Sequence, residues 1–170
     1  GRLTARHLLA SARSSAHPAV HPQTPDAPRI YDWNRVKTPQ EHGMAAVHDE
    51  TLRDGLQSPS VKDPSVDQKL DLVRGMVRVG ISSAALGQPA AGERHYKDTL
   101  QLMQRIADER LGITTRTLAG RTLIEDIRPI VEIKQQTGLP VEVTAYVGSS
   151  PIRHFVEDWN LDKVLGFVQE

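Results

Sequence analysis

Three absences in the sequence exclude whole classes of protein. No cysteine occurs among the 170 residues, so neither a disulfide framework nor a thiolate metal site can form. The 21 basic and 21 acidic side chains cancel, which leaves no net charge to favour nucleic acid or an anionic membrane. No apolar run approaches the roughly 20 residues that span a bilayer. We therefore expect a soluble protein that binds neither nucleic acid nor membrane.

The first 42 residues differ in composition from the rest and are predicted to form a disordered or extended tail. Residues 1–25 contain three arginines but no acid, and 17–39 is rich in Pro and His, a composition typical of unstructured segments. A basic, acid-poor start is also typical of an organellar transit peptide, and translated sequence upstream of the true start would look the same. We expect a cytoplasmic protein, with organellar targeting as the alternative.

From residue 43 onward, short apolar segments alternate with segments that carry apolar residues on one face at helical spacing. The expected strands are 45–48, 81–86, 113–118 and 141–147. The expected helices are one that begins at Asp63-Pro64 and ends at Gly80, one over 96–107, one over 123–137, and one that begins after Asn160. The strands start about 30 residues apart, which is the length of a βα unit and predicts a parallel sheet with right-handed crossovers.

Two parallel architectures compete for this pattern, a doubly wound open sheet and a (β/α)8 TIM barrel. No G-x-G-x-x-G and no P-loop follows any expected strand, so nucleotide binding by an open sheet has no support. We expect residues 43–170 to form the N-terminal half of a barrel, about four βα units. Four strands leave two edges unpaired and one face uncovered, which predicts either a truncated barrel or a homo-oligomer that hides the open side.

A segment rich in acids and containing an arginine, Asp49–Gln57, follows the first expected strand. Barrel enzymes carry their active sites at the carboxyl ends of the strands. At such a place the Asp54 carboxylate would supply a hard oxygen ligand for a divalent cation, and Arg53 would stabilise negative charge on a carbonyl or enolate oxygen. The alternative is purely structural: Arg53 and Asp54 form an ion pair at the strand end, and Gly55 makes a turn.

Three strings of residues carry a resemblance to a known family. Thr51–Gln57 reads T-L-R-D-G-L-Q and resembles the signature of the DRE-TIM metallolyase (HMGL-like) superfamily, in particular its 2-isopropylmalate and homocitrate synthase branch, whose usual form is D-T-T-L-R-D-G-x-Q. Ser149–Ile152 reads S-S-P-I and resembles the T-S-P-I of those synthases, and Gly87–Ala91 resembles their G-F-P-A-A. The lyases of the superfamily carry Pro where Leu52 stands, which favours the synthase branch and leaves a lyase or aldolase as an alternative.

The resemblance implies an acyltransferase of the kind used in leucine biosynthesis. Its reaction would be a Claisen-type condensation of an acyl-CoA with a 2-oxo acid, followed by thioester hydrolysis. Asp54 would bind a divalent metal (Mg, Mn or Zn), and Arg53 would be the catalytic residue that polarises the oxo-acid carbonyl or stabilises the enolate. Gln57, Ser149 and Ser150 would contact the substrate.

The sequence also departs from the family's pattern in three respects. The H-x-H pair that completes the family's metal site does not occur among the seven histidines, each of which, His48 included, we interpret as a surface or packing residue. Ala85 stands where the family has Glu near the end of its second strand, and Thr144 where it has His. We therefore predict part of a longer enzyme, with weak metal binding and no condensing activity of its own. A non-catalytic half-barrel that dimerises or binds a partner is the alternative.

Overall fold

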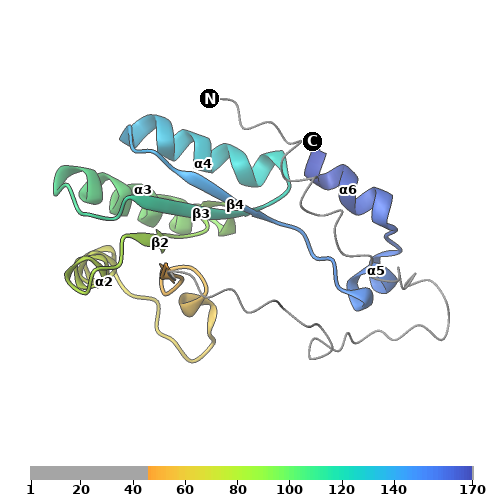
Figure 1. The fold of residues 1–170 in the computed structure, drawn as a ribbon, viewed down its shortest axis with the longest axis horizontal. Coiled ribbons are helices and arrows are strands. Elements are labelled where there is room, and N and C mark those ends of the chain that lie inside the picture. The colour runs from red at the N-terminus through yellow and green to blue at the C-terminus, as the bar shows by residue number, and fades with distance from the viewer. Residues whose placement is uncertain (1–45, 170) are drawn as a thin grey trace. The chain divides into compact units, whose positions relative to one another are not determined.

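A computed structural model describes residues 46–169, which form a parallel four-stranded sheet with helices between the strands (Figure 1). The strands are β1 (His48–Asp49), β2 (Ser83–Ala85), β3 (Thr115–Arg121) and β4 (Glu142–Tyr146), in the order β1-β2-β3-β4. The crossovers contain α2 (Val66–Arg78), α3 (Glu93–Asp108) and α4 (Ile124–Thr137), with the short 3-10 turns η2 (Gly55–Gln57) and η3 (Pro89–Ala91). The α/β class and the parallel sheet are thus confirmed as a partial (β/α) assembly. The predicted tail over 1–42 lies outside the described residues.

The described residues belong to two compact units. One contains 149–159 with α5 (Pro151–Glu157), and the other contains the sheet and α6 (Leu161–Gln169). The sequence predicted one helix in this region and missed α5. This helix begins where Ser150 Oγ accepts a hydrogen bond from Arg153 N at 3.2 Å, and Pro151 suits the first helical position because it has no N–H to satisfy. The predicted capping role of Asn160 is confirmed, since its Oδ1 accepts a hydrogen bond from Lys163 N at 2.8 Å.

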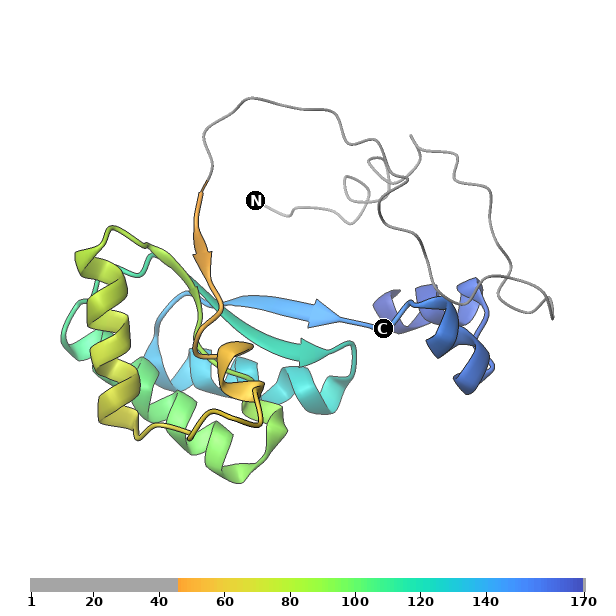
Figure 2. The same ribbon diagram turned by 90° about the horizontal axis from the view of Figure 1, so that it is seen from below.

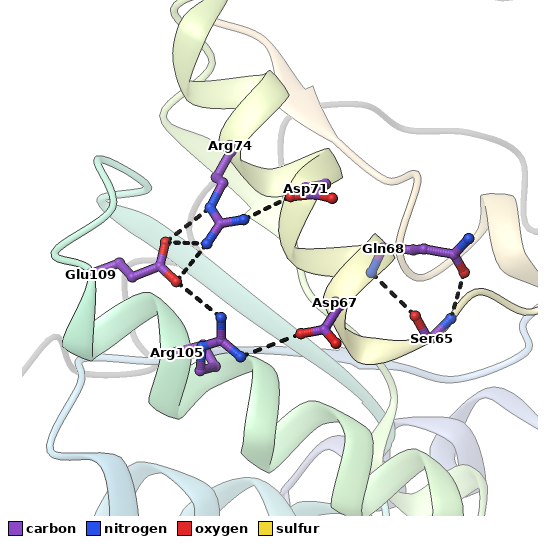
Figure 3. Close-up of polar contacts among 7 residues, drawn as sticks. All are labelled: Ser65, Asp67, Gln68, Asp71, Arg74, Arg105 and Glu109. Carbon is purple, nitrogen blue, oxygen red and sulfur yellow. Dashed lines mark hydrogen bonds and ion pairs between the residues drawn. The ribbon is translucent and has the colours of Figure 1, made fainter.

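Helix α2 begins later than the sequence predicts, at Val66 with Ser65 as its N-cap. Ser65 Oγ accepts a hydrogen bond from Gln68 N at 3.3 Å, and Ser65 N donates to Gln68 Oε1 at 2.9 Å (Figure 3). This capping box satisfies two backbone N–H groups that would otherwise lack partners. Asp63, which we expected at the helix start, pairs instead with Lys69 Nζ at 3.2 Å.

A network of ion pairs joins the solvent side of α2 to α3 (Figure 3). Arg74 lies 2.7 Å from Glu109 and 2.7 Å from Asp71, and Arg105 lies 3.3 Å from both Glu109 and Asp67. The hydrogen bond from Arg74 is the main reason why the pKa of Glu109 lies below its usual value. Exposed ion pairs contribute little to stability, so the packing of these two helices depends mainly on their apolar faces.

The hydrophobic core lies between the sheet and the three crossover helices, which cover one face of the sheet (Figure 2). Its most buried members include Leu70, Val73, Leu102, Met103, Ile106, Leu118, Ile130 and Ile133. Successive β3 side chains point to opposite faces: Leu118 joins this core, and Thr117 lies against His48. Strand β4 is exposed along its whole length. Among residues 46–169, no helix combines the length and the apolar content that a bilayer crossing requires.

A buried carboxylate fixes the end of β3 to the start of α4. Asp126 is only 2% exposed and accepts three hydrogen bonds from Arg121, at 2.9 Å from its backbone N, 2.8 Å from Nε and 2.8 Å from NH2. The hydrogen bond from the Arg121 guanidinium holds the pKa of Asp126 below its usual value, although burial opposes the shift. The charged form of Asp126 is therefore the one that the folded state favours.

Replacing Asp126 by Asn should lower the free energy of unfolding at pH 7 by about 2 kcal/mol, because charge-assisted hydrogen bonds to a buried group are lost. Since the folded pKa is depressed, the wild-type advantage is present above the unfolded pKa of about 3.9 and disappears as the pH falls through the lower folded value. Urea unfolding at pH 7 and pH 3 measures this difference, with the exposed neighbour Glu125→Gln as control. Equal stabilities of Asp126→Asn and wild type at pH 7 would contradict the assignment.

Candidate functional site

The segment after β1 is a tight turn organised around one backbone carbonyl. The Glu50 carbonyl oxygen accepts hydrogen bonds from the backbone N–H groups of Arg53, Asp54 and Gly55 at 3.1, 2.8 and 3.2 Å. Leu52 is 4% exposed and belongs to the core cluster, so it anchors the turn to the body of the fold. The turn therefore holds Arg53 at the carboxyl end of β1, as the sequence predicted.

The Arg53 guanidinium is held by a carboxylate from its own turn. Its Nε donates a hydrogen bond to Glu50 Oε2 at 2.6 Å, and NH1 lies 3.5 Å from Asp54 Oδ1. The bond to Glu50 is the main reason why the pKa of Arg53 lies above its usual value, so the side chain stays cationic. A guanidinium has five N–H donors, and the hydrogen bond to Glu50 uses one of them. No sequence pattern singles out Glu50, which occupies a position where the family that the chain resembles usually has Thr.

Two glutamines and a tyrosine meet across the carboxyl ends of three strands. Gln57 Nε2, from the turn after β1, donates to Gln88 Oε1 at 3.2 Å, and Gln88 Nε2 donates to the Tyr146 hydroxyl at 2.8 Å. Gln88 follows β2, and Tyr146 ends β4. Gln57 was a predicted site residue, whereas Gln88 appeared only within the G-Q-P-A-A string and Tyr146 carried no sequence signal. Their amides and hydroxyl can hydrogen-bond a polar ligand at this edge.

His48 makes polar contacts with three segments of the chain, so its interpretation as a surface or packing residue was incomplete. Its Nδ1 lies 2.6 Å from Ser83 Oγ on β2, and its Nε2 lies 3.2 Å from Thr117 Oγ1 on β3. The same Nε2 lies 3.3 Å from Glu50 Oε1. The imidazole thus connects the hydroxyls of the neighbouring strands to the carboxylate that holds Arg53.

A cavity of about 400 Å³ opens beside this turn. Its polar lining comes from Arg53, Gln57, Gln88, His95, Lys69, Asp63, Asp98 and Thr99, and its apolar lining from Leu52, Leu56, Leu86, Ala91 and Leu102. Lys69 is 6% exposed and pairs with Asp98 at 2.8 Å and Asp63 at 3.2 Å, so its charge is balanced within the protein. Two predicted site residues, Arg53 and Gln57, therefore border a cavity large enough for a small organic acid.

Gly87 brings the loop after β2 against α3 at this cavity. Its φ is +153°, and a Cβ atom at this position would lie 2.6 Å from Thr99 Oγ1. A side chain would clash with Thr99, so glycine is needed to keep the adjacent Gln88 in place.

The other predicted site residues, Asp54, Ser149 and Ser150, are not among those that line this cavity. The Asp54 side chain is 65% exposed and is not among the residues that line the cavity. Within residues 46–169 no three His, Asp or Glu side chains are grouped closely enough to hold a metal ion, so these residues do not form a complete metal site. Ser149 and Ser150 belong to the unit that contains α5, where Ser150 caps that helix. Their contact with substrate, and metal binding by Asp54, remain predictions.

Comparison with known proteins finds partial similarity to 2-isopropylmalate synthases and no matching family model. The chain is 33% identical over 63 residues to the 2-isopropylmalate synthase of Sulfurisphaera tokodaii, which covers 37% of the chain and 16% of that enzyme. It is 36% identical over 93 residues to the chloroplastic 2-isopropylmalate synthase 2 of Arabidopsis thaliana, covering 53% of the chain and 14% of the relative. A third relative, from Saccharolobus solfataricus, is 30% identical over 78 residues, which cover 44% of the chain and 20% of the enzyme. The likeness supports a synthase-like origin, and the matched segments span a fifth or less of these relatives.

Proposed function

We propose that this chain is part of a metal-dependent acyltransferase that condenses an acyl-CoA with a 2-oxo acid, in the manner of a 2-isopropylmalate synthase. The observation that carries the proposal is the placement of Arg53. Its guanidinium is fixed at the carboxyl end of β1, 2.6 Å from Glu50, and borders a cavity that Gln57 also lines. The partial similarity to 2-isopropylmalate synthases agrees with this reading.

In the proposed reaction, Arg53 acts on the oxygen that becomes negatively charged. A base removes a proton from the carbon next to the thioester, and the resulting enolate carbon attacks the ketone carbon of the 2-oxo acid. The electron pair of the C=O bond moves to oxygen, where the guanidinium donates hydrogen bonds, an effect worth about 10²–10³ in rate for a single donor. Gln57 and Gln88 donate to the oxo-acid carboxylate. The alkoxide takes up a proton, and water then cleaves the thioester to give a carboxylate and the free thiol of CoA.

We further propose that Asp54 is one carboxylate ligand of a divalent ion, Mg, Mn or Zn. Its exposed side chain at the strand end is a hard oxygen donor, the kind that such ions prefer. When bound, the metal would polarise the oxo-acid carbonyl as a Lewis acid. Because the described residues do not complete the site, the remaining ligands would come from other parts of a longer protein. Ser149 and Ser150 are proposed to contact substrate in that protein.

A free-CoA assay tests the proposed function. An acyl-CoA is mixed with pyruvate or a branched 2-oxo acid, and a thiol reagent detects released CoA; the chain itself contains no cysteine to react. We expect no CoA release from the purified 170-residue chain, and release by a longer polypeptide that contains it, dependent on both the 2-oxo acid and a divalent ion. Condensation by the chain alone would show that it contains a complete active site, contrary to the proposal. A folded longer polypeptide that releases no CoA with any 2-oxo acid would refute the proposed function.

The exposure of β4 favours a second candidate, a non-catalytic homo-oligomer. Val143 and Tyr146 on this strand are each 43% exposed, and an unpaired strand edge can pair with a second copy. Sedimentation analysis distinguishes the candidates: a stable dimer without any response to 2-oxo acids would favour the second.

A further inference from the structure

We propose that Glu50 is the positioning residue for Arg53, and that it supplies from the turn after β1 the carboxylate that Ala85 does not supply from β2. The inference rests on the proposed function, because a fixed orientation of Arg53 matters only if its guanidinium binds a ligand. It assigns a role to a residue that the sequence pattern did not single out.

The first support is the geometry of the Glu50 carboxylate, in which each oxygen lies close to a different side chain. Oε2 accepts the hydrogen bond from Arg53 Nε at 2.6 Å, and Oε1 lies 3.3 Å from His48 Nε2. The Arg53 side chain is 24% exposed and that of Glu50 37%. A bond to Nε fixes the plane of the guanidinium without using the terminal nitrogens, of which NH1 lies 3.5 Å from Asp54 Oδ1.

The second support is that Glu50 is anchored to the sheet and is not a mobile surface acid. His48, on β1, contacts Ser83 on β2 and Thr117 on β3. The imidazole beside the Glu50 carboxylate is therefore itself fixed by two neighbouring strands. The Glu50 carbonyl also accepts three backbone hydrogen bonds of the turn, which fixes its main chain. An isolated exposed pair three residues apart would add almost nothing to orientation or stability. Here the partners on both sides restrict the carboxylate.

The third support is the register of β1 against β2. His48 pairs with Ser83, and Asp49, the last residue of β1, pairs with Ala84. The same register carried one residue past β1 places Glu50 level with Ala85. Side chains at one level of neighbouring parallel strands are about 5 Å apart and point to the same face. Two glutamates there would place like charges side by side, which is destabilising. A glutamate at 50 is therefore compatible with an alanine at 85.

The Arg53 Nε–H resonance tests the proposal directly. In ¹⁵N-labelled chain this signal is assigned by its loss in Arg53→Lys, and its exchange with solvent is measured. We expect Glu50→Thr to speed that exchange by about tenfold or more, because a short charge-assisted bond is lost. The control Glu93→Thr removes an exposed glutamate that pairs only with Lys97 in the described structure, and should leave the exchange unchanged. Unchanged exchange in Glu50→Thr that melts like wild type would overturn the proposal.

Rescue and ligand response separate this proposal from the function on which it rests. A folded Glu50→Thr/Ala85→Glu double variant should regain slow exchange of Arg53 Nε–H. Fast exchange in that variant would overturn the claim that Glu50 takes the place of a carboxylate at position 85. Pyruvate added with Mg²⁺ should shift the Arg53 signal in wild type and shift it less in Glu50→Thr. If the longer polypeptide releases no CoA while Glu50→Thr still speeds the exchange of Arg53 Nε–H in the chain, the proposed function fails and the positioning role of Glu50 stands.

Discussion

Replacing Arg53 by lysine should lower kcat/KM for condensation about a hundredfold or more in a longer enzyme that contains this chain. Lysine keeps the positive charge but carries its three N–H donors on one nitrogen, so it cannot bond to Glu50 and also offer a ligand two separate nitrogens in a fixed plane, as Arg53 does. The loss should fall mainly on kcat if the guanidinium stabilises the developing oxyanion. Free-CoA release at varied 2-oxo acid concentration separates the two constants.

The matched control for that experiment is Arg74→Lys. Arg74 also pairs with carboxylates, those of Glu109 and Asp71, on the solvent side of α2 (Figure 3). It does not line the cavity and is distant in sequence from the turn after β1. The Arg74→Lys substitution should leave kcat/KM within about twofold of wild type, because exposed ion pairs contribute little to stability. Equal activities of the Arg53→Lys enzyme and wild type would exclude Arg53 from the reaction.

Replacing Leu70 by alanine should destabilise the fold far more than a substitution on the exposed face of the same helix. Leu70 lies on α2, is fully buried, and belongs to the main core cluster. Truncating it removes three carbons from a packed interior and leaves a cavity, which costs about 2–5 kcal/mol. Domains of this size are stable by only about 5–15 kcal/mol, so a large part of the free energy of unfolding would be lost.

Leu72 offers a control from the same helix. It lies two residues further along α2 and is 42% exposed, so Leu72→Ala should change stability by no more than about 0.5 kcal/mol. Urea unfolding of both variants, followed by circular dichroism, gives the comparison. Similar midpoints for the two variants would mean that α2 does not pack on the sheet through the face that Leu70 occupies.

The alternation of strands and helices followed from the sequence because apolar spacing and helix stops are local signals. Gly80 and Gly138 end α2 and α4 in the left-handed region, with φ of +86° and +66°. The strand limits were less well predicted. Ile113 is fully buried but lies before β3, which begins at Thr115, because an apolar residue indicates burial and not membership of a hydrogen-bonded ladder.

The site was predicted in part for a related reason. Arg53 and Gln57 stand in one short string, so their proximity could be anticipated from the sequence. Gln88 and Tyr146 lie 31 and 89 residues beyond Gln57 and meet it through the register of the sheet, which no short pattern encodes. The role of Glu50 depends on a side-chain conformation that points it back to Arg53, and that too is absent from the residue order.

The proposed role of the β1 edge is tested most directly by titrating the ¹⁵N-labelled chain with pyruvate in the presence of Mg²⁺. A 2-oxo acid site at this edge predicts saturable shifts of the side-chain signals of Arg53, Gln57 and Gln88, and their loss in Arg53→Lys. Shifts elsewhere on the protein, or the same response in Arg53→Lys as in wild type, would contradict it.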